Sequence, residues 1–179
     1  MPDIITILAP GFEETEAITV IDLLRRAKVN VTIAGLAARQ TKGSHDISII
    51  ADGLLGEMTG GFDGIVLPGG MPGSNNLAGS DRVLAMVRNM HEKGNLCAAI
   101  CAAPMVLGRA GILKGFSATC YPGYEKELIG ATFVDQAVVR DRTIITSRGL
   151  GTAVAFGLEL VSYLAGPEEA KRIKDAVLY

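Results

Sequence analysis

Histidine, the side chain used most often for acid–base catalysis, is scarce in this sequence of 179 residues. Only His45 and His91 are present. Positive charge is not in excess either, because 17 Lys and Arg against 19 Asp and Glu give a formal net charge of -2. A nucleic-acid-binding protein normally carries a basic face, so we expect no nucleic-acid partner.

Long apolar runs and a cysteine framework are also missing. No run reaches the length of a transmembrane helix, and the N-terminus lacks the basic-then-apolar pattern of a signal peptide. The three cysteines are an odd number at irregular spacing, which is not typical of a disulfide-stabilised protein. We therefore expect a cytoplasmic protein without a membrane partner. With 49% hydrophobic residues, the chain is predicted to form one domain over residues 1–179.

Short apolar runs alternate with amphipathic segments along the chain. Predicted strands lie at 3–8, 30–34, 47–50, 64–67 and 96–100, and a hairpin at 138–140 and 143–146. Predicted helices lie at 13–28, 81–93, 102–110, 153–165 and 168–177. This alternation predicts an α/β fold, a flavodoxin-like three-layer sandwich with a mostly parallel central sheet and helices on both faces. Ligands bind such sheets at the carboxyl ends of the strands, where residues 10–16, 69–70 and 101 are expected to meet.

Cys101 lies where an apolar strand turns directly into a predicted helix, in Ala-Ala-Ile-Cys-Ala-Ala-Pro. This pattern is typical of a nucleophile elbow, a sharp turn that aims one side chain at the cleft and needs small neighbours such as Ala99 and Ala103. A thiol at a helix N-terminus would also have a lowered pKa. The alternative is a buried structural cysteine, which is common.

Three glutamates, Glu13, Glu14 and Glu16, begin the first predicted helix. A buried carboxylic acid beside Cys101 could form a hydrogen bond with its sulfur, and the two groups would then titrate jointly. Each glutamate could equally be a surface acid that interacts with the helix dipole. The residues alone do not choose among the three. The turn Leu67-Pro68-Gly69-Gly70 could present backbone N–H groups to a ligand, as an oxyanion hole requires, or be a turn only.

Taken together, these motifs resemble a known family. The segments ILAPGFEETEAI, LPGG, AAICAAP and SRGLGTA occur in the order and at the intervals seen in the ThiJ/PfpI superfamily, and over most of the chain they are similar to its DJ-1 branch and bacterial YajL-like relatives. The resemblance implies that Cys101 is the reactive thiol and Glu16 its protonated partner. It also implies that Gly70 and Ala102 supply backbone N–H groups, that Gly69 is a site neighbour, and that the protein is a homodimer.

One position departs from the family pattern. A histidine is expected after the elbow helix, but the matching stretch is Thr119-Cys120-Tyr121-Pro122, with Tyr121 in its place. Tyr121 would face Cys101 across the cleft or simply pack at the dimer rim. Cys120 could approach Cys101 or be a small buried residue. Neither His45 nor His91 is expected to replace the missing histidine.

Two functions agree with these residues. The resemblance implies a cofactor-free enzyme, glyoxalase III-like or protein deglycase-like, in which Cys101 attacks 2-oxoaldehydes or glycated proteins and Glu16 shuttles a proton. The alternative is a redox-sensing, stress-protective, chaperone-like protein whose Cys101 is oxidised to a sulfinate. A PfpI-type protease would carry histidine after the nucleophile, where Ala102 stands, and a glutamine amidotransferase needs a downstream histidine. No metal or cofactor is expected, since Cys97, Cys101 and Cys120 would not converge on zinc.

Overall fold

The computed structural model describes residues 1–179 and is organised around a seven-stranded sheet with the order β10-β11-β7-β6-β1-β2-β5. Its strands are β1 (Asp3–Leu8), β2 (Asn30–Gly35), β5 (Gly53–Leu54), β6 (Gly64–Leu67), β7 (Leu96–Ile100), β10 (Val138–Asp141) and β11 (Ile144–Ser147). Every neighbouring pair is parallel except the edge hairpin β10–β11. The order β2-β1-β6-β7-β11 is the flavodoxin-like one, so the predicted mostly parallel sheet is confirmed.

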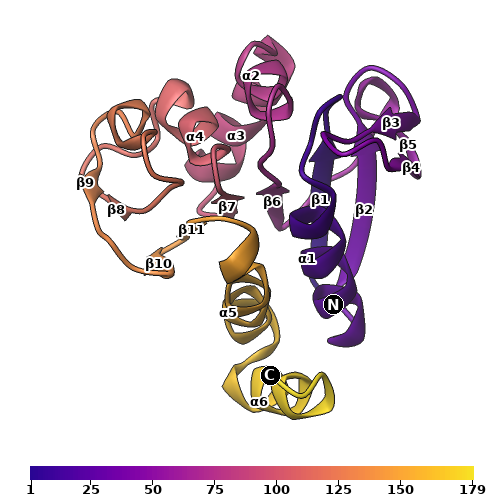
Figure 1. Ribbon diagram of the computed structural model, residues 1–179, viewed down its shortest axis with the longest axis vertical. Helices are drawn as coiled ribbons and strands as arrows, with labels where there is room; N and C mark the ends of the chain where they lie inside the picture. Colours follow the sequence, from indigo (N-terminus) through magenta and orange to yellow (C-terminus); the bar gives the residue numbers. More distant parts are fainter.

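Helices cover both faces of this sheet (Figure 1). In that view α5 and α6 lie toward the bottom of the molecule, and α2, α3 and α4 lie toward the top. The helices are α1 (Glu14–Arg26), α2 (Gly73–Ala78), α3 (Asp81–Glu92), α4 (Pro104–Ala110), α5 (Ala153–Ala165) and α6 (Pro167–Ala176). None of them combines the length and the apolar character that crossing a bilayer requires.

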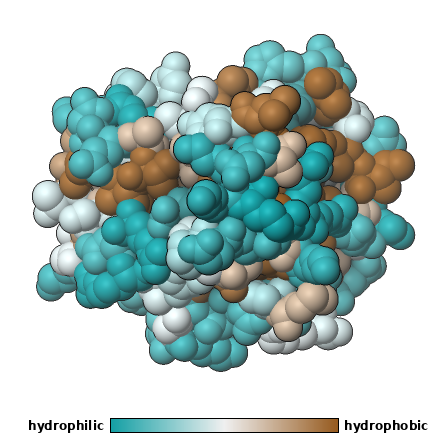
Figure 2. Space-filling model, turned by 90° about the horizontal axis from the view of Figure 1, so that it is seen from below, coloured by the Kyte–Doolittle hydropathy of each residue, from teal (hydrophilic) through white to brown (hydrophobic).

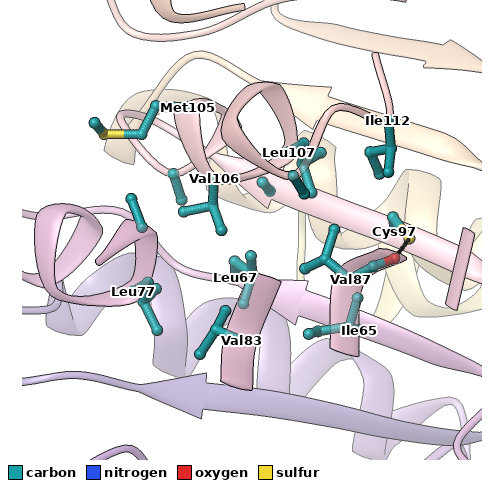
Figure 3. Close-up of a cluster of buried hydrophobic side chains, with 14 of the residues drawn as sticks. Ile65, Leu67, Leu77, Val83, Val87, Cys97, Met105, Val106, Leu107 and Ile112 are labelled. Carbon is teal, nitrogen blue, oxygen red and sulfur yellow. Dashed lines mark hydrogen bonds between the residues drawn. The ribbon is translucent and has the colours of Figure 1, made fainter. Parts of the chain in front are cut away.

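The sheet separates two hydrophobic cores, because successive residues of a strand point to opposite faces. One core, of 26 buried residues, packs α2, α3 and α4 against β6 and β7, and the other, of 24, packs α1, α5 and α6 against the opposite face. Figure 3 shows the first core, with Ile65 and Leu67 of β6 facing Val83 and Val87 of α3. The Cys97 thiol, also in this core, donates a hydrogen bond to the Val87 carbonyl at 3.7 Å.

Several elements differ from the sequence prediction. Residues 40–42, predicted in part as a turn, form β3 (Gln40–Lys42), which pairs with β4 (Ser48–Ile50). The sequence did not predict α2, or the two-residue strands β5, β8 (Ser117–Ala118) and β9 (Thr132–Phe133). Helix α4 begins at Pro104 rather than Ala102, because proline, which lacks an N–H, is well tolerated in a first helical turn. Cys101 is therefore separated from the helix by a short turn.

Candidate active site

The carboxyl ends of β1, β6, β7 and β11 meet at one edge of the sheet, as expected from the sequence. The N–H of Glu13 donates to the Gly69 carbonyl at 2.8 Å, which links the segment after β1 to the turn after β6. The N–H of Cys101 donates to the Ser147 carbonyl at 3.0 Å, which links the end of β7 to β11. This edge also contains the point where the chain order reverses between β1 and β6, the usual ligand site of such sheets.

Cys101 adopts a backbone conformation that L-residues rarely occupy. Its φ angle is +65°, in the left-handed region. Such a conformation costs about 1–3 kcal/mol for a residue with a side chain and occurs most often at functional sites. The turn leaves Cys101 partly exposed, whereas Ile100 and Ala102 on either side are buried. The backbone N–H groups of Gly70 and Ala102 form hydrogen bonds with the Cys101 sulfur.

The structure brings Glu16, rather than Glu13 or Glu14, to the thiol. The Glu16 side chain is buried, with 1% of the residue exposed, and it shares a hydrogen bond with Cys101. Its Oε2 accepts the N–H of Gly69 at 2.9 Å. Glu13 caps α1 by accepting the Glu16 N–H at 2.6 Å, and Glu14 turns to the loop between β3 and β4.

Gly69 and Gly70 allow the turn after β6 to approach the pair closely. A Cβ atom on Gly69 would lie 2.5 Å from Cβ of Cys101 and 2.6 Å from Oε2 of Glu16. Gly70 has a φ angle of +90°, and a Cβ there would lie 2.3 Å from the Glu13 nitrogen. Gly69 is therefore required because a side chain there would have no space. Gly70 is required for the same reason and also because of its positive φ angle.

The two side chains shift each other's pKa. Burial raises the pKa of Glu16 to about 7, against the hydrogen bonds from Gly69 and Cys101, which lower it. Burial, followed by the negative charge of Glu16, raises the pKa of Cys101 to about 12, although the N–H groups of Gly70 and Ala102 lower it. Coupled groups lose their protons as a pair, so the pair carries one negative charge between these two values.

The lowered thiol pKa expected from the sequence requires a protonated Glu16, because burial and an ionised Glu16 both raise the pKa of Cys101. The helix whose N-terminus would favour a thiolate begins three residues later, at Pro104, and burial acts in the opposite direction. A thiolate at Cys101 is stable only beside a protonated Glu16, which carries no charge and can donate a hydrogen bond to the sulfur. The pair thus shares one proton, whose position determines whether sulfur or oxygen carries the charge.

The structure places Tyr121 beside this pair. Its N–H donates to the Cys101 carbonyl at 2.8 Å, and its side chain is about half exposed. A Cβ on Gly149 would lie 3.3 Å from Cδ2 of Tyr121 and 3.9 Å from Oε1 of Glu16, so both side chains border that glycine. Cys120 is fully buried in the core under α2, α3 and α4, and burial raises its pKa to about 11.

Neither histidine joins the pair, and one of them has partners that the sequence did not predict. His91 is half-buried, and the centres of its ring and the Phe116 ring lie 5.5 Å apart in an edge-to-face arrangement. His45, in the loop between β3 and β4, lies beside Glu13 and Glu14. Burial would raise the pKa of Glu14, but hydrogen bonds from the His45 and Ile47 backbone hold it below its usual value. These contacts join residues about 30 positions apart, so local sequence gave no signal for them.

Comparison with known proteins gives consistent matches. The DJ-1/PfpI family matches residues 3–163. Protein dj-1beta of Drosophila melanogaster is 43% identical over 178 residues, which cover 97% of this chain and 95% of the relative. Its crystal structure superposes with a TM-score of 0.95 at 42% identity, covering 99% of this chain and 97% of that one. The glutathione-independent glyoxalase DJR-1.2 of Caenorhabditis elegans is 34% identical over 164 residues, 90% of this chain and 87% of the relative.

Proposed function

This chain belongs to the DJ-1/PfpI family, and we propose that it is a cofactor-free cysteine enzyme acting on 2-oxoaldehydes or their early glycation adducts. The observation that carries the proposal is the pair Cys101–Glu16, in which a thiol on a strained backbone faces a buried carboxyl whose pKa is raised to about 7. A relative named as a glutathione-independent glyoxalase supports a small carbonyl substrate.

With methylglyoxal as substrate, the reaction begins from the form in which Cys101 is a thiolate and Glu16 is protonated. The sulfur bonds to the aldehyde carbon, the carbonyl π pair moves to oxygen, and Glu16 protonates that oxygen. During this step the N–H groups of Gly70 and Ala102 stabilise the developing negative charge. The product is a hemithioacetal that leaves Glu16 as a carboxylate.

Glu16 next removes the proton from the carbon that bears sulfur and, after a proton passes between the two oxygens, returns one to the neighbouring carbon. The result is a lactoyl thioester on Cys101. Water then attacks the thioester carbon, Glu16 takes its proton, and the thiolate leaves. Overall, methylglyoxal and water give lactate and a proton, so no redox cofactor or other reactant is consumed.

Tyr121 favours a second function, a redox sensor. Without a histidine at this position, Glu16 is the one acid–base side chain in contact with the Cys101 thiol, so turnover would be slow. Peroxide would oxidise the Cys101 thiolate through a sulfenate to a sulfinate, which the N–H groups of Gly70 and Ala102 and a protonated Glu16 would stabilise. A solved structure of Toxoplasma gondii DJ-1, 33% identical with a TM-score of 0.93, is described as oxidized.

Cys101→Ser tests the proposed enzyme. We expect the variant to lose methylglyoxal consumption by more than about 100-fold, because a serine hydroxyl does not ionise here and cannot replace the thiolate. Cys97→Ser is the matched control, since its hydroxyl can keep the hydrogen bond to the Val87 carbonyl. Equal consumption by wild type and Cys101→Ser would contradict the proposal. Negligible consumption by wild type, with mass spectrometry showing oxygen added first to Cys101 under mild peroxide, would favour the redox sensor.

A homodimer is a further part of the proposal. The outer side of α1 and the hairpin β3–β4 expose Ile18, Ile47 and Ile50, which are 50%, 57% and 72% exposed. Between α1 and β4 lies a groove of about 250 Å³ bordered by further isoleucines. Figure 2, which views the molecule of Figure 1 from below, shows hydrophobic residues in separate groups on that face. Clustered exposed apolar side chains are typical of protein–protein interfaces.

We expect light scattering at micromolar concentration to give about twice the chain mass of 18.7 kDa. Ile18→Glu should shift the mass toward the monomer, because a carboxylate would be buried in the interface. Ile129→Glu changes an exposed isoleucine far along the chain from this patch and is the control. A wild-type mass equal to one chain would contradict the dimer.

A cytoplasmic location belongs to the same proposal. All three cysteines are free in the structure, and free thiols persist in reducing compartments.

A further inference from the structure

Glu13, Glu14 and His45 form a cluster separate from the Cys101–Glu16 pair. One donor atom from each residue lies within 4.8 Å of the other two. Nδ1 of His45 is 3.1 Å from Oε2 of Glu14 and 3.9 Å from Oε1 of Glu13. Donors that share a tetrahedral zinc ion at about 2.0–2.2 Å are separated by about 3.3 Å. Compared with this separation, the His45–Glu14 distance is about 0.2 Å shorter and the His45–Glu13 distance about 0.6 Å longer, so a small shift of the exposed imidazole would bring its nitrogen to the separation that a shared ion needs.

Backbone N–H groups orient one oxygen of each carboxylate, and the other oxygen of each lies toward His45. Oε2 of Glu13 accepts the N–H of Glu16, while its Oε1 accepts no hydrogen bond and faces His45. Oε1 of Glu14 accepts the N–H of His45 at 2.7 Å. Its Oε2 accepts the Ser44 hydroxyl at 3.4 Å and shares a hydrogen bond with Nδ1 of His45 at 3.1 Å, the contact that an ion would replace. Metal-binding side chains are commonly oriented in this way by hydrogen bonds from outside the metal's coordination sphere.

Neither lysine nor arginine balances the charge of this cluster. The side chains of Glu13 and Glu14 are only 11% and 5% exposed, and the one basic group in contact with either is the imidazole of His45. No lysine or arginine forms an ion pair with them, although lysine and arginine form eight ion pairs elsewhere in the chain. Adjacent buried carboxylates are costly without a cation.

We propose that Glu13, Glu14 and His45 bind a divalent transition-metal ion such as Zn²⁺. Two carboxylate oxygens and an imidazole nitrogen suit borderline metals of the zinc class rather than Ca²⁺ or Mg²⁺, which prefer oxygen alone. His45 is 71% exposed, so solvent can supply the remaining ligand. The ion would link the loop between β3 and β4 to the first turn of α1.

The loop is shaped to lie against Glu14. A Cβ atom on Gly43 would be 2.3 Å from the Glu14 carboxyl carbon, so only glycine lets the loop approach this closely. The N–H of Ser44 donates to the Phe12 carbonyl at 2.8 Å and fixes the loop beside α1. His45 is therefore held near both carboxylates before an ion binds, which reduces the entropy cost of binding.

Calorimetric titration of the purified protein with Zn²⁺ tests the site. We expect one ion per chain and an affinity that falls more than about 10-fold in both His45→Ala and Glu13→Gln, since loss of even an outer partner costs that much. His45 is exposed, so His45→Ala should keep the fold. His91→Gln changes the other histidine and should bind Zn²⁺ as the wild type does.

The Cys101 thiol is the competing zinc ligand, and Cys101→Ser separates the two sites. We expect this variant to keep its affinity, and Co²⁺ added in place of Zn²⁺ to show no thiolate-to-cobalt charge-transfer band. Unchanged affinity in His45→Ala, or lost affinity in Cys101→Ser, would overturn the proposal. Because the readout is metal binding rather than turnover, it is independent of whether the proposed enzyme function holds.

Discussion

Replacing Glu16 with glutamine is expected to slow methylglyoxal consumption by about 10²- to 10⁴-fold, the usual contribution of a general acid–base. The glutamine oxygen can still accept the N–H of Gly69, so the turn after β6 keeps its position. The amide cannot take up and release a proton, however, and three steps of the proposed reaction need this exchange. Steady-state rates of the two proteins at pH 7 provide the measurement.

The partly exposed carboxylate Glu169 of α6, which pairs with Arg172, provides the matched control. Glu169→Gln makes the same chemical change on the surface and should keep the wild-type rate. Circular dichroism should show that Glu16→Gln remains folded. A folded Glu16→Gln protein that consumes methylglyoxal at the wild-type rate would show that Glu16 is not the proton shuttle.

Tyr121→His is expected to raise turnover by up to about 100-fold, the lower end of the general acid–base range. A phenol donates a hydrogen bond at neutral pH but does not readily accept a proton, whereas an imidazole does both. The side chain is half exposed and borders Gly149 beside the Glu16 carboxyl, so a smaller ring fits without disturbing the core. Rates of wild type, Tyr121→His and Tyr121→Phe on methylglyoxal test this expectation.

Tyr121→Phe separates the phenol's chemistry from its packing, because it removes only the hydroxyl. A slower Tyr121→Phe would show that the phenol takes part in the reaction. If wild-type turnover is already fast, unchanged in Tyr121→Phe and no faster in Tyr121→His, the missing histidine has no importance.

The sequence predicted the parts of the fold that depend on local pattern. The apolar run 96–100, the small residues around Cys101 and the hairpin β10–β11 all appear where periodicity and turn residues placed them. Helix α5 begins and ends at the predicted residues. Short elements such as α2 were missed because six residues rich in glycine and asparagine carry no clear helical period.

The sequence identified the candidate thiol of the site, Cys101, but not the arrangement of the groups around it. Spacing alone could not choose among Glu13, Glu14 and Glu16, because the choice depends on how the first turn of α1 meets the turn after β6. The position of the shared proton was not predictable for a related reason, since burial and the charge of Glu16 appear only in three dimensions. The contacts of His45 depend on the pairing of β3 with β4, which brings distant residues together.

The central claim is that Cys101 and Glu16 hold two protons at low pH, lose one of them near pH 7 and then share the other. Only the thiolate reacts with iodoacetamide, so the alkylation rate of Cys101 measures how much charge the sulfur carries at each pH. Above about pH 7 the pair has lost one proton, and a fixed fraction of that charge lies on sulfur. Loss of the second proton is opposed by burial and by the negative charge already present, which raise the pKa of Cys101 to about 12.

The decisive measurement is therefore the pH dependence of Cys101 alkylation in wild type and Glu16→Gln, followed by mass spectrometry. In wild type the rate should rise with an apparent pKa near 7 and then stay level to above pH 9. In Glu16→Gln, where the thiol titrates alone in a buried site, the level region should disappear and the rate should keep rising with pH. Identical profiles in the two proteins, or a wild-type rate that rises only above pH 8.5 like an ordinary thiol, would contradict the shared proton.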